Sequence, residues 1–405
     1  MIIRDYVSCN TCSHIHITRI QVGMDPTQVH VFNCKGCNEP IKVSLKADYE
    51  KAIATTVLLE NCSRVHSGEG TPIYLCADFA ADPEQINQEM TFPSFKFLND
   101  IKDAVGIEQM LKMSTKAKRS NCNDDLSIMT NWNSLKQIWR LENSGKYEIS
   151  RKLNIKLSQK NKIPEEGFAN NLWRFLNAIF TQPDELRAEL KEIIANNREE
   201  FIKFLYFYKF EIRPIHRKNQ FQIMSEFYDG YNQHSQIFPY IRLNIPLSKI
   251  GKVTLTEFDQ VKSFYANIYE FFAGAICIYT CLNNIKEGRP YDQLKNITLS
   301  KYLETDKAKR RESFISNLLF ASLTEEFDST VRNASFHNWF FLRADNETIE
   351  LRSGGTGALK TISYTEYLYR CGKMYSQFCK LFILELELDQ ITADLNVFTF
   401  TIPTT

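Results

Sequence analysis

Two pairs of cysteines constrain the start of this chain more than any other feature. Cys9 and Cys12 form one C-x-x-C pair, Cys34 and Cys37 form a second, and 21 residues separate the pairs. This is the spacing of a four-thiolate zinc site, in which soft sulfur ligands surround a metal that has no geometric preference of its own. Because four thiolates leave no open position for water or substrate, we expect a structural zinc ion that stabilises a module too small for its own core.

Apolar and polar residues alternate around the cysteines. Residues 14–22 (HIHITRIQV) and 29–34 (VHVFNC) each predict a strand, with a turn at residues 23–26 between them. We expect one hairpin with the cysteine pairs near its two ends, and the segment resembles a zinc ribbon over residues 1–46. His14 and His16 are near enough to replace a ligand, but both face one side of an alternating strand, and we interpret them as surface residues.

Length and charge limit what the rest of the chain can do. With 405 residues, 43% of them apolar, we expect two or three domains. The 49 Lys and Arg nearly balance 48 Asp and Glu, so any attraction to nucleic acid must be local. The longest nearly apolar run, residues 271–282, is shorter than the roughly 20 residues that cross a bilayer, and the N-terminus lacks a signal-peptide core. Since four of eleven cysteines fit a metal site, which suits a reducing compartment, we predict a cytoplasmic protein without membrane contact.

We predict a mainly α fold with three domains. Residues 1–46 form the β zinc ribbon, and residues 47–245 form a mixed, mostly helical middle domain with a recognition or regulatory role. Residues 246–405 form a helical domain with a small β-hairpin insertion.

One stretch of the middle domain is strongly basic. Residues 112–162 hold twelve Lys or Arg against four acids, with aromatic residues interleaved at Trp132, Trp139 and Tyr147. A nucleic-acid face is one interpretation, because cations neutralise phosphates while rings stack on bases. A solvated basic surface is the other. On the first interpretation, the phosphate-binding residues are Lys112, Lys116, Lys118 and Arg119.

The last 160 residues show helical periodicity. Thr254 and Glu257 fit a capping box before an amphipathic helix that continues to Leu282, and apolar residues from Ile315 to Val331 predict a second helix. FFLRA and TIELRS then predict a hairpin. A second capping box at Ser363 and Glu366 precedes the final helix.

Arg332, Asn333 and His337 lie between the second helix and the hairpin. The segment reads Arg332, Asn333, Ala334, Ser335, Phe336, His337, and it resembles the motif of the HEPN ribonucleases: an Arg, a polar residue that is often Asn, three variable residues and a His. The hairpin and the capped final helix are similar to those of the Apea-like branch, which is found in antiphage and abortive-infection proteins. The resemblance covers roughly residues 250–390.

The resemblance implies a HEPN-like helical bundle and a metal-independent endoribonuclease that acts on RNA. It also implies a homodimer in which two motifs form one composite site, and a toxin or antiviral-defence role with an antitoxin or a phage-derived trigger as a further partner. The residues suit this chemistry, because His transfers protons near neutral pH while Arg grips two phosphate oxygens.

A hypothesis from another class of protein stays open. Arg332 could cap the preceding helix through its C-terminal carbonyls while His337 merely packs. The chain would then be a non-catalytic zinc-ribbon protein that binds nucleic acid or serves as a scaffold, with a dimerising helical domain.

Overall fold

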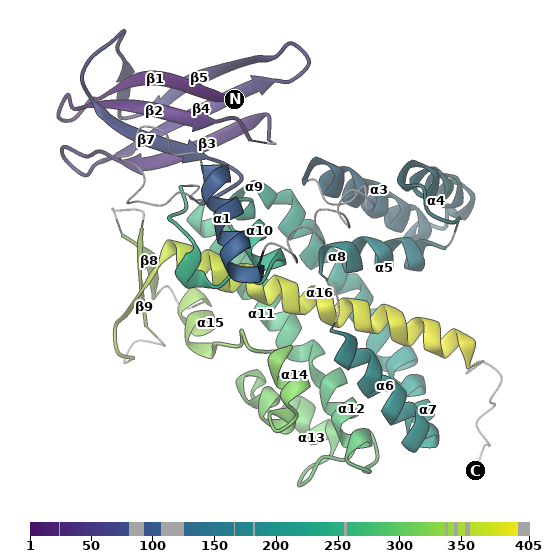
Figure 1. The fold of residues 1–405 in the computed structure, drawn as a ribbon. Coiled ribbons are helices and arrows are strands. Elements are labelled where there is room, and N and C mark those ends of the chain that lie inside the picture. Colours follow the sequence, from purple (N-terminus) through teal and green to yellow (C-terminus); the bar gives the residue numbers. More distant parts are fainter. Residues whose placement is uncertain are drawn as a thin grey trace. The chain divides into compact units, whose positions relative to one another are not determined.

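The computed structural model describes residues 1–23, 25–80, 93–106, 125–165, 167–180, 183–254, 257–336, 339–343, 347–352 and 357–395. Over these residues the protein is mainly helical and has three small β-sheets (Figure 1). The chain forms two compact units, each assembled from three segments. The first unit comprises Met1–Leu126, Asp229–Tyr265 and Thr330–Lys373, and the second comprises Ser127–Tyr228, Ala266–Ser329 and Met374–Thr405.

Seven strands near the N-terminus form two sheets of the first unit. One has the order β6-β1-β2-β7, in which only β2 and β7 are parallel, and the other has the antiparallel order β3-β4-β5. Apolar side chains of both sheets, such as Val7, Ile41 and Leu75, share one core. The strands are β1 (Ile2–Cys9), β2 (Ile15–Gln21), β3 (Thr27–Asn33), β4 (Pro40–Asp48), β5 (Ile53–Glu60), β6 (Cys62–Arg64) and β7 (Thr71–Cys76).

The predicted hairpin between residues 14–22 and 29–34 is wrong. Both segments are strands, but β2 pairs with β1 and β7 while β3 pairs with β4. Each cysteine pair therefore lies in the turn of its own hairpin, β1–β2 or β3–β4. Alternation located two strands correctly, but it carried no information about the partner strands before and after them.

His16 is buried, contrary to its interpretation as a surface residue. Along β2 the side chains of His16, Thr18 and Ile20 point inward, while Ile15 and Ile17 are partly exposed. His16 Nε2 accepts a hydrogen bond from the backbone N–H of Lys35 at 3.1 Å, so the inward ring fastens the second cysteine turn to β2. Hydrogen bonding at the core outweighed the preference for burying isoleucine.

The side-chain amide of Gln236 attaches the segment Asp229–Tyr265 to the strands. Gln236 Nε2 donates to the carbonyl of Cys76 at 2.6 Å and to Thr254 Oγ1 at 3.1 Å, and Gln236 Oε1 accepts from Thr254 N. The predicted capping box at Thr254 and Glu257 is therefore wrong, because the N–H of Glu257 donates to Gln233 Oε1 instead. The N–H of Glu257, which a capping box would bond to Thr254, is bonded to a glutamine that is distant in the sequence. The short helices α9 (Tyr231–His234) and α10 (Phe238–Arg242) belong to this segment, and α1 (Pro93–Val105) belongs to the same unit.

The predicted long amphipathic helix forms with one interruption. It consists of α11 (Phe258–Ala275) and α12 (Cys277–Lys286), which Ile276 separates with a ψ of −7°. The run Phe258–Lys286 is long and apolar enough to cross a membrane by length and composition, but 83% of its apolar window is buried inside the protein. That burial is typical of a core helix in a soluble protein.

The predicted helix from Ile315 to Val331 is two short helices. The side chain of Asn317 accepts hydrogen bonds from the N–H groups of Leu319 and Phe320, so it begins α14 (Leu318–Ser322) as an N-cap. A separate helix, α15 (Ser329–Phe336), follows. Before them lie α13 (Leu299–Glu304) and a 3₁₀ segment, Lys307–Phe314.

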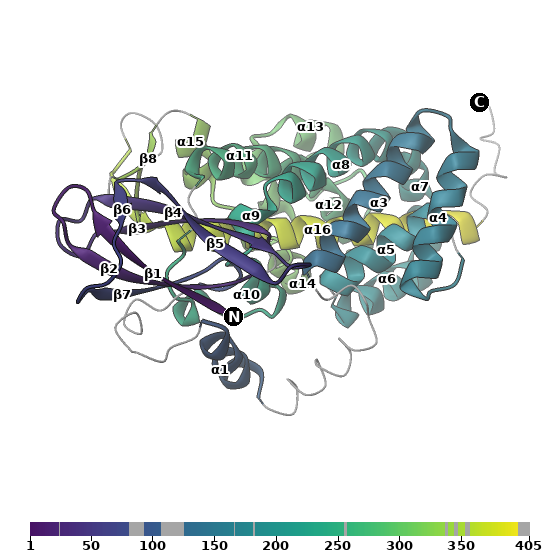
Figure 2. The ribbon, with the colours of Figure 1, turned by 90° about the horizontal axis from the view of Figure 1, so that it is seen from above.

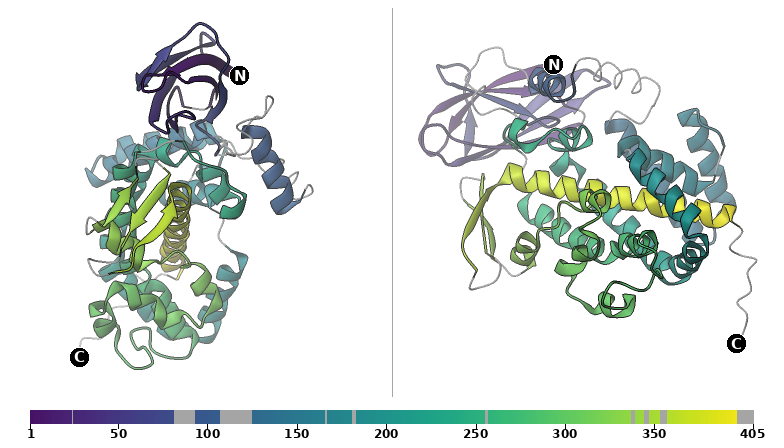
Figure 3. Two further views of the ribbon diagram at one scale, coloured as in Figure 1. Left: turned by 90° about the vertical axis from the view of Figure 1, so that its left-hand side faces the viewer. Right: turned by 60° about the horizontal axis from the view of Figure 1, so that its bottom comes forward.

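The predicted hairpin insertion is confirmed and gains a third strand. β8 (Phe340–Leu342), β9 (Thr348–Leu351) and β10 (Lys360–Ser363) form an antiparallel sheet in the order β10-β9-β8 (Figure 3). The final helix α16 (Tyr364–Asp394) begins where Ser363 Oγ accepts from the N–H of Glu366 at 3.0 Å, as predicted. The reciprocal half of that box does not form, because the Glu366 carboxylate pairs with Arg370.

Aromatic side chains fill the core of the second unit. Trp132 is fully buried and stacks on Tyr228 at 5.1 Å, while Trp139 stacks on Phe221 at 4.3 Å. Helix α4 packs beside α5, and α12 lies beside α6 and α7 (Figures 1 and 2). The helices are α3 (Asp125–Asn143), α4 (Tyr147–Asn161), α5 (Phe168–Ile179), α6 (Asp184–Asn196), α7 (Arg198–Phe207) and α8 (Arg213–Asp229), with a π-helical turn at Tyr208–Ile212 between the last two.

Candidate metal centre and candidate catalytic cluster

The two cysteine turns have the same backbone geometry. The N–H of Cys9 donates to the carbonyl five residues later, and the N–H of Ser13 donates back to Cys9, both at 2.9 Å. Cys34 and Asn38 repeat both bonds at 2.8 Å. Ser13 and Asn38 also share a left-handed conformation, with φ of 62° and 64°. Two copies of one turn therefore present their cysteines in the same way.

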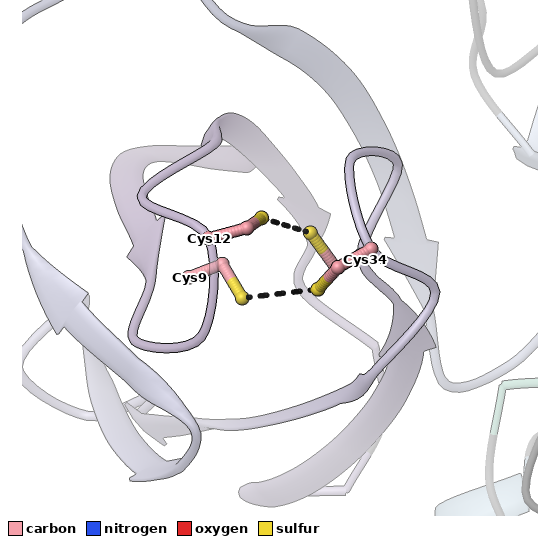
Figure 4. A group of neighbouring side chains, drawn as sticks. Cys9, Cys12 and Cys34 are labelled. Atoms are coloured by element: carbon pink, nitrogen blue, oxygen red, sulfur yellow. Dashed lines mark hydrogen bonds between the residues drawn. The ribbon is translucent and has the colours of Figure 1, made fainter.

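These turns bring four sulfur atoms together. Cys9 Sγ lies 3.8 Å from Cys37 Sγ, and Cys12 Sγ lies 3.5 Å from Cys34 Sγ (Figure 4). All four sulfurs lie within 4.8 Å of one another. A tetrahedron with Zn–S bonds of about 2.3 Å has edges of about 3.8 Å. The described geometry therefore fits a metal such as zinc, as the cysteine spacing predicted.

Backbone amides point at the sulfur of the first cysteine in each turn. Burial acts to raise the pKa of Cys9, but N–H groups of Cys12 and Thr11 outweigh it and lower that pKa to about 7. The Cys34 sulfur also accepts from backbone N–H groups, yet burial raises its pKa. Several thiolates this close to one another repel, so a cation would be needed to hold them together.

Asn61 is a residue of this centre that the sequence patterns missed. Its side-chain amide contacts Cys9 Sγ at 3.8 Å and donates to the carbonyl of Pro40 at 3.0 Å. It thereby joins the first cysteine turn to the start of β4. Neighbouring Cys62 directs its thiol to the carbonyl of Lys42 and does not join the four sulfurs. No local pattern marks Asn61, since it acts across 52 positions of the chain.

Arg332 and Asn333 form a bonded pair on α15. Val331 and Ala334 are buried and anchor the helix, while the two polar side chains are half-buried. Arg332 Nη1 donates to Asn333 Oδ1 at 2.8 Å. Helix α15 ends at Phe336, and His337 lies outside the described residues. The spacing of four residues between Asn333 and His337 predicts that they would share one face of a helix, and this stays a prediction.

The basic segment divides into parts with different outcomes. Lys112, Lys116, Lys118 and Arg119 lie outside the described residues. In the described part, Trp132 is fully buried and packs in an aromatic cluster with Tyr228. Its ring is therefore not accessible to a base, and its predicted role as a base-stacking ring is wrong. Lys152, Lys156 and Lys160 form an exposed stripe along α4.

A buried carboxylate and an imidazole also meet in the second unit. Glu385 is fully buried, and its carboxylate accepts hydrogen bonds from His216 Nδ1 at 3.0 Å, Gln220 Nε2 at 2.8 Å and the hydroxyl of Tyr208 at 3.4 Å. The only sequence signal for this network is a charged residue on the apolar face of the last helix, at i+7 from Phe378.

His216 also borders a cavity of about 610 Å³. Cys277 lines the same cavity, but burial raises the pKa of its thiol to about 12, so this sulfur is not an activated nucleophile. The imidazole at the edge of the cavity can bind a polar group. Nucleophilic chemistry at Cys277 is not supported.

No family model, curated protein or solved structure matches this chain. The functional assignment therefore depends on residue chemistry, geometry and the resemblance of the Arg332 to His337 segment.

Proposed function

We propose that zinc binds the four-cysteine cluster and that its role is structural. Sulfur separations of 3.5 Å and 3.8 Å support this assignment. With four thiolate ligands the coordination sphere is closed, so the metal would stabilise the two turns and would not meet a substrate. Purified protein should contain one zinc per chain. Replacing Cys34 with Ser should release zinc and lower thermal stability.

We further propose that the protein is a metal-independent endoribonuclease of HEPN type. The observation that carries this proposal is the Arg332 to Asn333 hydrogen bond on α15, which joins a guanidinium and an amide that precede His337 by five and four residues in the sequence. Together with the capped final helix, this supports a HEPN-like bundle in the C-terminal region. A toxin or abortive-infection role in the cytoplasm is proposed on the resemblance alone.

The chemistry assigns a role to each residue. His337 would move protons between the 2′-hydroxyl and the departing 5′-oxygen, since its unperturbed pKa is near working pH. Arg332 would stabilise the charge of the pentavalent phosphorane with its planar donors. Asn333 would hold the guanidinium in place through its Oδ1. One His per chain falls short of an acid and a base together, so a two-fold homodimer with two motifs in one composite site is part of the proposal.

The test is cleavage of labelled RNA in EDTA, with the cysteine centre shown to stay folded. Wild-type protein should leave 2′,3′-cyclic phosphate and 5′-hydroxyl ends, and a DNA strand of the same sequence should survive because it lacks the attacking hydroxyl. His337→Ala and Arg332→Ala should each remove most activity without changing the melting temperature.

The matched control is Arg187→Ala, which removes a surface arginine paired with Glu387. This variant should cut RNA at the wild-type rate. If His337→Ala also cuts at that rate, the ribonuclease proposal is wrong. The alternative of a non-catalytic nucleic-acid-binding or scaffold protein then takes its place.

A further inference from the structure

The sheet β8–β9–β10 has one buried face and one exposed face. On the buried face, Phe340 packs on Tyr367 with ring centroids 4.8 Å apart, and Ile349 and Leu351 are also buried. On the other face, Trp339 is 38% exposed and Phe341 is 54% exposed. An isolated exposed aromatic residue is ordinary, but two at alternate positions of one strand form a continuous apolar surface.

Strand register places polar partners beside these rings. Phe341 lies opposite Glu350, which in turn lies opposite Thr361. The carbonyl of Trp339 accepts from the N–H of Arg352 at 3.0 Å, so these two residues are opposite each other. Since side chains alternate along a strand, the exposed face carries Trp339, Phe341 and then Arg343 along β8, about 7 Å from one to the next.

One basic side chain lies beside these rings without an ion-pair partner. Arg343 forms an ion pair with Glu350, which leaves no net charge from that pair. Among the described residues, the side chain of Arg352, opposite Trp339, has no ion-pair partner. Exposed rings beside an arginine suit single-stranded nucleic acid, because bases stack on rings while phosphates contact Lys and Arg.

We propose that this face, which consists of Trp339, Phe341 and Arg352, stacks bases of single-stranded RNA beside the cleaved bond. The inference rests on the proposed ribonuclease function for its substrate. Trp339 follows the end of α15 by three residues and belongs to the same compact unit as Arg332. A strand held at Arg332 therefore has this face within reach of its neighbouring nucleotides.

A second copy of the chain is the competing occupant. Among the strands that the structure describes, β8 lies at an edge of its sheet, and an edge strand can pair with another strand. It has only three residues, however, so such a pairing would be short. The cation beside the rings, Arg352, also complements a phosphate and does not complement a second copy of the same basic residue. The observations therefore favour RNA.

The experiment measures binding of a fluorescein-labelled 12-nucleotide RNA to the full chain carrying His337→Ala, so that binding is observed without cleavage. In this background Phe341→Ala and Trp339→Ala should each weaken binding by about 5- to 100-fold, which corresponds to about 1–3 kcal/mol per stacked base. Phe341→Trp keeps an aromatic ring and should bind the RNA as tightly as the parent. Leu359→Ala is the matched control, since Leu359 is 50% exposed but not aromatic. It should bind as the parent does.

Unchanged RNA affinity in Phe341→Ala would overturn the inference. If sedimentation shows that the same change separates a dimer while RNA affinity is unchanged, the face belongs to a second copy of the chain. The two proposals can fail separately. Aromatic-dependent RNA binding without cleavage by the wild type would remove the ribonuclease and leave the stacking face. Cleavage that is equally efficient in Phe341→Ala, measured as kcat/KM, would remove only the stacking face.

Discussion

Ser13 and Asn38 occupy equivalent left-handed positions in the two cysteine turns, each four residues after the first cysteine of its pair. A left-handed backbone costs about 1–2 kcal/mol for an ordinary L-residue and much less for Gly or Asn. The two turns therefore differ in strain even though their hydrogen bonds are the same.

Substitutions at these two positions should have opposite effects. Asn38→Val should lower the free energy of unfolding by about 1–2 kcal/mol and speed zinc release, whereas Ser13→Gly should match or exceed wild-type stability. Thermal denaturation and a chelator-based zinc assay measure both. Ala52 is also left-handed, with φ of 53°, but lies outside the cysteine turns. Ala52→Gly should raise stability without changing zinc release, and wild-type behaviour of Asn38→Val would contradict the strain argument.

Zinc retention should also be sensitive to a single methyl group added at Gly36. A Cβ atom at Gly36 would lie 3.0 Å from Cys12 Sγ and 3.0 Å from the Cβ of His14. Gly36→Ala should therefore displace a ligand sulfur and accelerate zinc loss. Gly274→Ala is the control, because a Cβ there meets only Arg310 Nη1, at 3.9 Å, and a helical Gly→Ala change favours folding. Equal zinc retention in both variants would show that the second turn adjusts freely.

The metal centre shows which information a sequence contains locally. Ligand identity and spacing are local, so Cys9, Cys12, Cys34 and Cys37 could be predicted. Strand pairing depends on distant partners, and neither the two separate hairpins nor the inward ring of His16 could be derived from alternation. Asn61 could not be predicted either, because the fold brings it to Cys9 from 52 positions away in the sequence.

The buried carboxylate of Glu385 should be far more sensitive than its neighbour on the same helix. Glu385→Gln turns one of the two carboxylate oxygens into an NH2 donor, so it faces a donor of Tyr208 or of the pair His216 and Gln220, and the free energy of unfolding should fall by about 2–4 kcal/mol. Glu387 pairs with the partly exposed Arg187, so Glu387→Gln should cost less than about 1 kcal/mol. Denaturant titration compares the two, and equal losses would contradict the importance of this network.

Stability of the first unit should fall as pH decreases from about 6.5 toward 4. Burial lowers the pKa of His30 to about 4 and that of His234 to about 3. Both pKa values lie below the unfolded value of about 6.5, so the unfolded state binds more protons and acid favours unfolding. At pH 5 each histidine should reduce stability by about 2 kcal/mol relative to neutral pH.

Burial also lowers the pKa of His16 to about 4, so a double variant isolates only the share of His30 and His234. His30→Gln combined with His234→Gln should reduce the fall in melting temperature between pH 7 and pH 5, compared with wild type at equal zinc content. His66 is the control, because it is exposed. His66→Gln should leave the pH profile unchanged. A double variant with the full wild-type slope would assign the acid sensitivity to other groups.

In the C-terminal region some helix ends could be predicted from the sequence and others could not. Ser363 could be predicted as a cap because its partner is three residues away, and β8 and β9 could be predicted from alternation. The division of the expected helix after Ile315 depends on Asn317, a single capping residue inside an apolar pattern. The apolar periodicity predicted one continuous helix, but the cap at Asn317 starts a new helix within it.

Arg332 and Asn333 offer the sharpest comparison within the proposed catalytic cluster. Arg332 Nη1 donates to Asn333 Oδ1, so the amide holds one edge of the guanidinium. Arg332→Lys keeps the charge but loses the planar donors, so it should lower kcat/KM for RNA cleavage by at least about tenfold. Asn333→Ala should have a smaller effect, because the arginine remains. The double change Arg332→Ala with Asn333→Ala should be scarcely worse than Arg332→Ala alone, since the amide acts through the arginine. Strictly additive losses, with melting temperatures unchanged, would mean that Asn333 contacts RNA independently and that the hydrogen bond between the two side chains is incidental.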